Sequence, residues 1–92
     1  MPRFFVEVPH GASKEECDRA IQMFLNMGSH FVTNADWGCM EGEHKAWFIC
    51  DIEDKESVIR ILPPMFRPVA KIVSVQKFSA KDIPEIMEGH GS

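Results

Sequence analysis

The chain has 92 residues, of which 45 % are apolar and 26 % are charged, and it carries a net charge of −4. This composition is typical of one soluble globular domain, and the scattered Lys and Arg residues form no basic patch for a nucleic-acid backbone. The longest apolar runs fall far short of the about 20 residues that span a membrane. Neither nucleic acid nor a membrane is therefore expected as a partner.

The amino terminus and the cysteines favour the cytoplasm. The first residues are strand-like and lack a cleavable secretory pattern. The three cysteines are an odd number with no Cys-x-x-Cys pair, which indicates thiols in a reducing compartment. We expect Cys17 and Cys50 to be small apolar core residues and Cys39 to be the exposed thiol.

The predicted elements follow the order strand, helix, strand, strand, helix, strand. A β-rich run covers residues 4–8, and a helix covers about 13–27, because Ser13 and Glu16 form a capping box ahead of apolar residues at helical spacing. Strands are expected at about 30–37 and 45–52, on either side of a glycine-containing turn.

A second helix covers about 55–62, opened by Asp54 and ended by Pro63 and Pro64. The last strand covers about 69–78, where β-branched residues are dense. Ser79 and Asp82 then predict the cap of a short C-terminal helix with Ile83, Ile86 and Met87, followed by a mobile tail over residues 89–92.

This order of elements is the split βαβ, or ferredoxin-like, pattern. We therefore expect one α+β domain over residues 1–92, with a ferredoxin-like core at 3–78 and a C-terminal helix and tail at 79–92. The sheet would be four-stranded and antiparallel, with the strand order fourth, first, third, second. The first two strands would run one way and the last two the other.

The predicted strands mix apolar and polar residues on both faces. Two helices cover only one face of the sheet, and monomers rarely expose a large apolar patch on the other. We therefore expect a homodimer formed through the sheet face that the helices leave open, which gives a dimeric α+β barrel. The alternative is that the C-terminal helix covers this face within the same chain.

Residues 36–44 contain more chemically active side chains than a turn requires. Two glycines suffice to reverse the chain, yet this segment also holds acidic residues, a thiol and an imidazole. The expected topology places it at the same end of the sheet as His10 and the loop at Arg67. His30 would begin the second strand, about 20 Å from Asp36 at about 3.3 Å per residue. His30 and His44 are therefore not expected to share one site within a chain.

The polar residues at this end of the sheet predict a metal site. His10, Asp36, Cys39 and His44 offer nitrogen, oxygen and sulfur ligands, which suit divalent nickel, zinc or copper better than magnesium or calcium. With the turn centred near residue 41, Asp36 opposes Ala46 and lies diagonal to His44, so its carboxylate could orient the imidazole. Alternatively, Asp36 caps the turn through its own backbone and His44 is an ordinary edge residue.

Trp37 and Trp47 fall on one face of the sheet in this register. They favour packing in a core or an interface, or they form the wall of an apolar ligand cavity in which Arg67, Asp36 or His44 supplies the orienting polar group. In the second case, His44 and Asp36 become candidates for a catalytic His–Asp pair.

The segment Leu62-Pro63-Pro64-Met65-Phe66, which leads into Ile72-Val73-Ser74-Val75, resembles the dimeric α+β-barrel superfamily, which includes muconolactone isomerase and small monooxygenases and cyclases. The Cys- and Asp-containing hairpin, followed by a Lys-Glu-x-Val-Ile-type helix, is similar to small uncharacterised ferredoxin-like proteins, one branch of which binds nickel. The resemblance covers about residues 3–78. The superfamily's cyclases often use a Tyr together with a His, and this chain has no Tyr.

Three functions remain open on these grounds. The first is a small binding protein for a transition-metal ion or small ligand at the hairpin end of the sheet. The second is a cofactor-free isomerase or cyclase with a His–Asp pair in an apolar cavity, and the third is an assembly domain with no small-molecule site. The first is favoured because the ligand-type residues exceed the needs of the turn while the catalytic pattern is incomplete.

Overall fold

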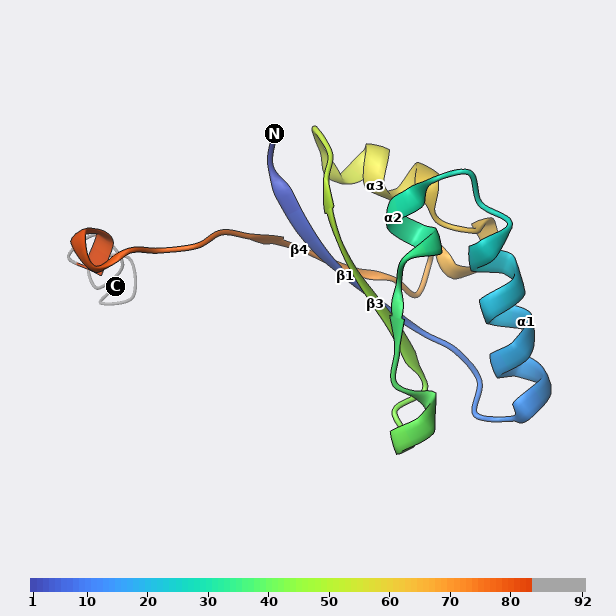
Figure 1. The fold of residues 1–92 in the computed structure, drawn as a ribbon. Coiled ribbons are helices and arrows are strands. Elements are labelled where there is room, and N and C mark those ends of the chain that lie inside the picture. Colours follow the sequence, from blue (N-terminus) through green and yellow to red (C-terminus); the bar gives the residue numbers. More distant parts are fainter. Residues whose placement is uncertain (84–92) are drawn as a thin grey trace.

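The computed structural model describes residues 1–83, and this part of the chain is an α+β fold with one four-stranded antiparallel sheet and three α-helices (Figure 1). The sheet order is β2-β3-β1-β4, which is the order expected from the sequence. The strands are β1 (Arg3–Pro9), β2 (Asp36–Trp37), β3 (Lys45–Asp51) and β4 (Lys71–Val75). The predictions for Ile86, Met87 and the tail at 89–92 lie outside the described residues.

The two main helices begin at the predicted capping residues. Helix α1 (Lys14–Leu25) begins after Ser13, whose hydroxyl oxygen accepts the backbone N–H of Glu16 at 3.1 Å. Helix α3 (Lys55–Ile61) begins after Asp54, whose carboxylate accepts the backbone N–H of Ser57 at 2.8 Å. Short polar side chains at these positions satisfy backbone donors that the first helical turn leaves free.

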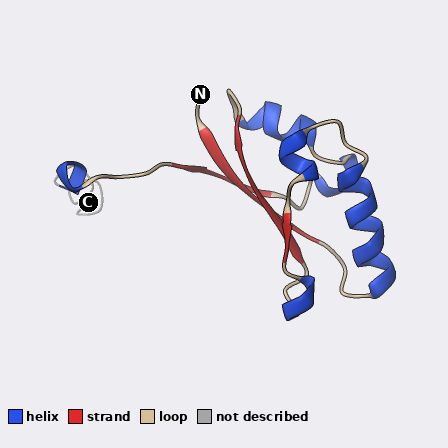
Figure 2. Cartoon of the chain, in the orientation of Figure 1, coloured by secondary structure: helices blue, strands red, loops and turns tan. Residues whose placement is uncertain are grey.

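One face of the sheet carries the hydrophobic core, and the helices lie on that side (Figure 2). Side chains that alternate along β1 and β3 point into this layer, and they meet the apolar sides of α1, α2 (His30–Thr33) and α3. The buried core residues are Phe4, Val6, Val8, Ala20, Phe24, Val32, Ala46, Phe48, Cys50, Val58, Leu62 and Phe66.

The strand predicted at 30–37 is wrong over its first half, which forms the short helix α2. The backbone N–H and the side-chain amide of Asn34 both donate to the His30 carbonyl, at 3.1 and 2.7 Å, and the Thr33 hydroxyl donates to the same oxygen at 3.2 Å. Such local hydrogen bonds from Thr and Asn compete with strand pairing. The helix also buries Val32 in the core. His30 and Asp36 consequently line one cleft, so the expected distance of about 20 Å for an extended chain does not apply.

The hairpin register also differs from the expected one by one residue. Asp36 pairs with Trp47 and Trp37 pairs with Ala46, so the expected pairing of Asp36 with Ala46 is wrong. Because side chains alternate between the faces of a strand, a shift of one residue exchanges the faces of the two partners. Trp37 therefore packs against the core, while Trp47 and Asp36 lie on the opposite, open face of the sheet.

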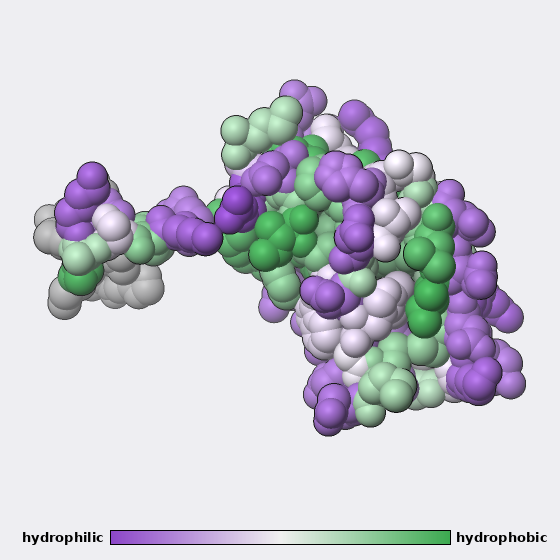
Figure 3. All heavy atoms as spheres, in the orientation of Figure 1, coloured by the Kyte–Doolittle hydropathy of each residue, from purple (hydrophilic) through white to green (hydrophobic). Residues whose placement is uncertain are grey.

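The open face has a mixed surface with an apolar centre. Ile49 is 54 % exposed and Val73 is 38 % exposed, and Figure 3 shows hydrophobic surface gathered beside the place where the C-terminal arm leaves the body. This arm, residues 76–83, extends away from the sheet (Figure 1), so its described part does not cover the open face. The arm contains the predicted cap, in which the backbone N–H and the hydroxyl of Ser79 both donate hydrogen bonds to the Asp82 carboxylate. Within residues 1–83, no helix has the length and apolar character of a membrane span.

Candidate metal centre

Three side chains with metal-binding atoms gather at the hairpin end of the sheet. One ligand atom from each of His10, Cys39 and His44 lies within 4.8 Å of the other two. This is the one such group of His, Cys, Asp and Glu side chains in residues 1–83. Three of the four predicted metal ligands are therefore brought close enough together to hold one metal ion.

The ends of β1 and β3 place the two histidines side by side. The last pair of the β1–β3 ladder is Pro9 and Lys45, and the backbone N–H of His10 then donates to the carbonyl of His44 at 3.0 Å. Alternation along the strands sets both imidazoles on the same face as the buried Val8 and Ala46. The histidines thus extend the core face of the sheet to its end.

The turn between β2 and β3 delivers Cys39 to the histidines. Cys39 opens a short 3-10 turn, η1 (Cys39–Glu41), which ends at Gly42 with a φ of 81°, a left-handed conformation that suits glycine. Gly38 lies against the Trp47 ring so closely that an added Cβ would be 2.7 Å from two ring carbons. The two glycines therefore permit the compact turn that carries the thiol.

The Cys39 sulfur contacts groups on both sides of it. It lies 3.1 Å from Nε2 of His10 and 2.9 Å from the sulfur of Cys17. Burial, followed by this contact with Cys17, raises the pKa of Cys39 to about 11. The thiol therefore holds its proton at neutral pH in the metal-free chain, and it is half-buried rather than freely exposed.

Cys17 contacts this cluster through Cys39, and the sequence interpretation missed this contact. Cys17 was expected to be a small apolar core residue, yet it is half-buried beside Cys39. Its helical spacing from Ala20 and Phe24 places it on the inward side of α1, one turn nearer the helix N-terminus. The inward position of Cys17 could therefore be predicted from the sequence. Its contact with Cys39 could not, because it depends on the turn that places Cys39 beside α1.

The two imidazoles are ligand-type groups in an aromatic environment. Burial, then the neighbouring His44, lowers the pKa of His10, while Glu16 opposes this shift. The rings of His10 and His44 lie edge to face with their centroids 5.9 Å apart, and the ring centroid of Trp37 lies 5.4 Å from that of His10. Within the described part of the chain, Nδ1 of both histidines is buried without a hydrogen-bond partner. Buried polar atoms normally have a hydrogen-bond partner, but the described residues supply none to these two nitrogens.

Comparison of the chain with family models, with curated proteins and with solved structures finds no match. The site must therefore be interpreted from its own geometry.

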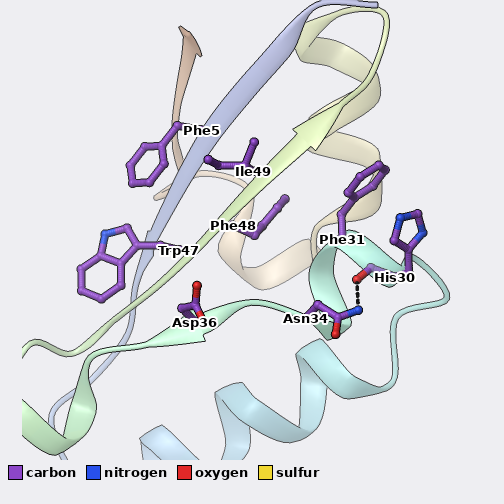
Figure 4. A pocket seen from close by; sticks show the side chains of 8 residues that line it. All are labelled: Phe5, His30, Phe31, Asn34, Asp36, Trp47, Phe48 and Ile49. Atoms are coloured by element: carbon purple, nitrogen blue, oxygen red, sulfur yellow. Dashed lines mark hydrogen bonds between the residues drawn. The ribbon is translucent and has the colours of Figure 1, made fainter. Parts of the chain in front are cut away.

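Asp36 is not part of the cluster. It pairs with Trp47 on the open face, whereas His44 continues the core face, so the expected His44–Asp36 pair is not formed. Asp36 instead borders a cleft of about 470 Å³ that is lined by open-face side chains of β1 and β3 and by residues of α2. We call it the open-face cleft. Figure 4 shows Phe5, Ile49 and Trp47 along the sheet side of this cleft, with His30 and Phe31 on α2.

The three residues proposed to line a ligand cavity do not lie together. Trp47 borders the open-face cleft, while Trp37 packs on the core side, with its ring centroid 4.9 Å from that of Phe24. Arg67 closes the end of α3, where its guanidinium donates to the carbonyls of Leu62 and Arg60 at 3.1 and 3.0 Å. Only Trp47 of this set therefore borders an apolar cleft. His30, as expected, is not in the group formed by His10, Cys39 and His44.

Proposed function

We propose that this protein binds a divalent transition-metal ion through His10, Cys39 and His44. The observation that carries the proposal is the convergence of one ligand atom from each residue within 4.8 Å of the others. The three residues come from the end of β1, the turn and the start of β3, so their proximity results from folding rather than from sequence adjacency. The two buried and unsatisfied imidazole nitrogens support the same assignment.

The donor set favours zinc, nickel or copper over the hard cations. Imidazole and thiolate are nitrogen and sulfur donors, whereas magnesium and calcium prefer oxygen. The lowered pKa of His10 favours the neutral imidazole, which is the form that coordinates a metal. The enzyme alternative depended on a carboxylate beside His44, and Asp36 lies on the other face of the sheet. Metal binding is therefore the function that the arrangement supports best.

Metal content and calorimetric titration test this proposal. The purified chain should bind zinc, nickel or copper at one site, and His10→Ala and His44→Ala should each weaken binding more than about tenfold, since loss of even an outer-shell partner costs about that much. His30→Ala is the matched control, because His30 is exposed on α2 and outside the cluster. Unchanged affinity for all three metals in His44→Ala would exclude this site.

We also propose that the chain is a ferredoxin-like protein that forms a homodimer through its open sheet face, as in dimeric α+β barrels. The strand order β2-β3-β1-β4 supports the first part. The second rests on the partly exposed apolar side chains of the open face, which a second copy would remove from water. They are Phe5, Trp47, Ile49, Val73 and Val75.

The open-face cleft supports a second candidate function, the binding of a small apolar ligand. Phe5, Phe31 and Trp47 provide aromatic surface, and Asp36 provides one charged group at the border. Concave apolar sites with a few polar groups are typical of ligand pockets. Native mass spectrometry of the purified chain should then reveal a retained small molecule, and Ile49→Ala should weaken its retention while leaving metal binding intact.

A further inference from the structure

We propose that Cys17 is a fourth ligand and that His10, Cys17, Cys39 and His44 form a closed Cys2His2 site for zinc. This inference rests on the proposed function, since it completes the same site. Its starting observation is the distance of 2.9 Å between the sulfur atoms of Cys17 and Cys39, two thiols that are 22 residues apart in the chain. The Cys39 sulfur is also 3.1 Å from Nε2 of His10.

The contacts of Cys39 with Cys17 and with His10 are near the spacing of ligands that surround one ion. A tetrahedral zinc ion with bonds of about 2.0–2.3 Å separates its ligand atoms by about 3.3–3.8 Å. The sulfur atoms are farther apart than the about 2.05 Å of a disulfide. Cys17 lies outside the group whose ligand atoms are all within 4.8 Å of one another, so its sulfur has to approach the histidines by about 1 Å or more to complete the zinc geometry. Binding would convert both thiols to thiolates, with the released protons passing to solvent.

The fold explains why Cys17 lies at the same end of the molecule as the other three residues. His10 and His44 extend the core face of the sheet beyond Val8 and Ala46. Cys17 extends the inward side of α1 in the same direction, and the start of α1 lies at the hairpin end of the molecule (Figure 1). The space between helix and sheet is thus filled by apolar side chains along most of its length and by ligand-type side chains at this end.

A fourth protein ligand changes the nature of the site. Three ligands leave a coordination position for water or substrate, whereas four close the site, as in structural zinc centres. A tetrahedral set of two sulfur and two nitrogen donors selects zinc over nickel and copper, which favour square-planar or tetragonal geometry as divalent ions. The ion would also link α1 to the hairpin, which is a common means of stabilising a small domain.

Cobalt substitution in the reduced, full-length chain tests the inference. Wild-type protein should give the intense visible bands of tetrahedral Co²⁺ together with a near-ultraviolet thiolate-to-cobalt band. Cys17→Ser and Cys39→Ser should each keep about half of the thiolate band, since one of two thiolates is lost, and should lower zinc affinity by more than about tenfold. Cys50→Ala is the matched control, because Cys50 is buried in the core beside Phe4 and should leave both readouts unchanged.

The outcomes separate the two proposals. If Cys17→Ser keeps the full thiolate band and zinc affinity while Cys39→Ser loses them, the three-ligand site stands and Cys17 is not a ligand. If the wild-type chain gives no tetrahedral cobalt spectrum and binds zinc no better than His44→Ala, the metal-binding function itself fails. X-ray absorption of the zinc-loaded wild-type chain needs no variant. Two sulfur and two nitrogen neighbours would support the Cys2His2 site, and one sulfur neighbour would overturn it.

Discussion

Trp47 and Glu7 lie opposite each other on β3 and β1, and the indole nitrogen of Trp47 donates a hydrogen bond of 3.0 Å to the Glu7 carboxylate. This hydrogen bond, assisted by the charges of Lys45 and Lys71, lowers the pKa of Glu7. The indole N–H is therefore satisfied within the chain, and Glu7 also lies 3.8 Å from the Lys45 ammonium. A second molecule can cover the Trp47 ring without burying an unsatisfied donor.

Ile49→Glu should convert the proposed dimer to a monomer, because it places a charge on the partly exposed apolar surface of the open face. Light scattering at about 50 μM should show a dimer for the wild type if its Kd is near 1 μM or below. Ile59→Glu is the control, since Ile59 lies on α3 and is also partly exposed. A wild-type monomer at this concentration, or equal dimerisation of both variants, would contradict the proposed interface.

Gly42→Ala should weaken metal binding as well as stability. The φ of 81° at Gly42 is unfavourable for alanine by about 1–2 kcal/mol, and the strain would be relieved by distortion of the turn that holds Cys39. Gly28→Ala is the matched control, because an added Cβ there meets nothing within 4 Å and its φ is not left-handed. Zinc titration and urea unfolding of both variants check this, and equal effects at the two glycines would refute the role of the turn.

Phe24→Ala should be strongly destabilising, by about 3–5 kcal/mol. Phe24 is 1 % exposed and packs edge to face with Trp37 at 4.9 Å and with Phe66 at 5.8 Å, so its removal leaves a cavity between α1 and the rest of the core. The neighbouring Leu25 is 55 % exposed, and Leu25→Ala should change the free energy of unfolding by less than about 0.5 kcal/mol. Urea denaturation measures both, and similar losses for the two variants would contradict this packing.

Acidification should weaken the cap of α3. The backbone N–H of Ser57 lowers the pKa of Asp54 in the folded chain, so the stabilisation is fully present above the unfolded value of about 3.9. It is lost as the pH falls through the lower pKa of the folded state. Unfolding experiments at pH 7 and at about pH 3 should therefore show a smaller acid-induced loss of stability in Asp54→Asn than in the wild type.

Asparagine is an informative replacement at this position because its amide oxygen still accepts the Ser57 N–H without titrating. Asp54→Ala should be less stable than Asp54→Asn at pH 7, since alanine removes the acceptor. If the wild type and Asp54→Asn lose stability equally on acidification, the Asp54 carboxylate does not contribute to the pH dependence.

The main helices and the strand order could be predicted from the sequence because their signals are local. Ser13 and Asp54 cap the helices that follow them, and the prolines after Leu62 end the second one. The alternation along 45–52 likewise predicts β3 almost to its ends. His10, Cys39 and His44 could be placed at one end of the sheet because that placement needs only the order of the elements.

Helix α2 and the contact between Cys17 and Cys39 could not be obtained in this way. Residues 30–33 contain aromatic and β-branched side chains that favour a strand, but burial of Val32 and the hydrogen bonds to the His30 carbonyl stabilise a helix instead. Cys17 has the spacing of a core residue, and its contact with Cys39 spans 22 residues of chain. Sequence spacing along one helix carries no information about which turn packs over it.

The sequence by itself determined where the two main helices and the strands β1 and β3 lie, and the end of the sheet where the ligand-type residues gather. It also located β4, but the predicted strand at 69–78 is longer than the observed Lys71–Val75. The tertiary structure alone decided which face each hairpin residue occupies. A turn longer by one residue pairs Asp36 with Trp47, and this shift sends Asp36 to the open face and Trp37 into the core. The physical reason is the two-residue period of a strand, by which the smallest change of register reverses every side chain. That register depends on the turn that Gly38 and Gly42 permit. It also depends on the packing of Trp37 against Phe24 of α1, which is a contact between distant parts of the chain.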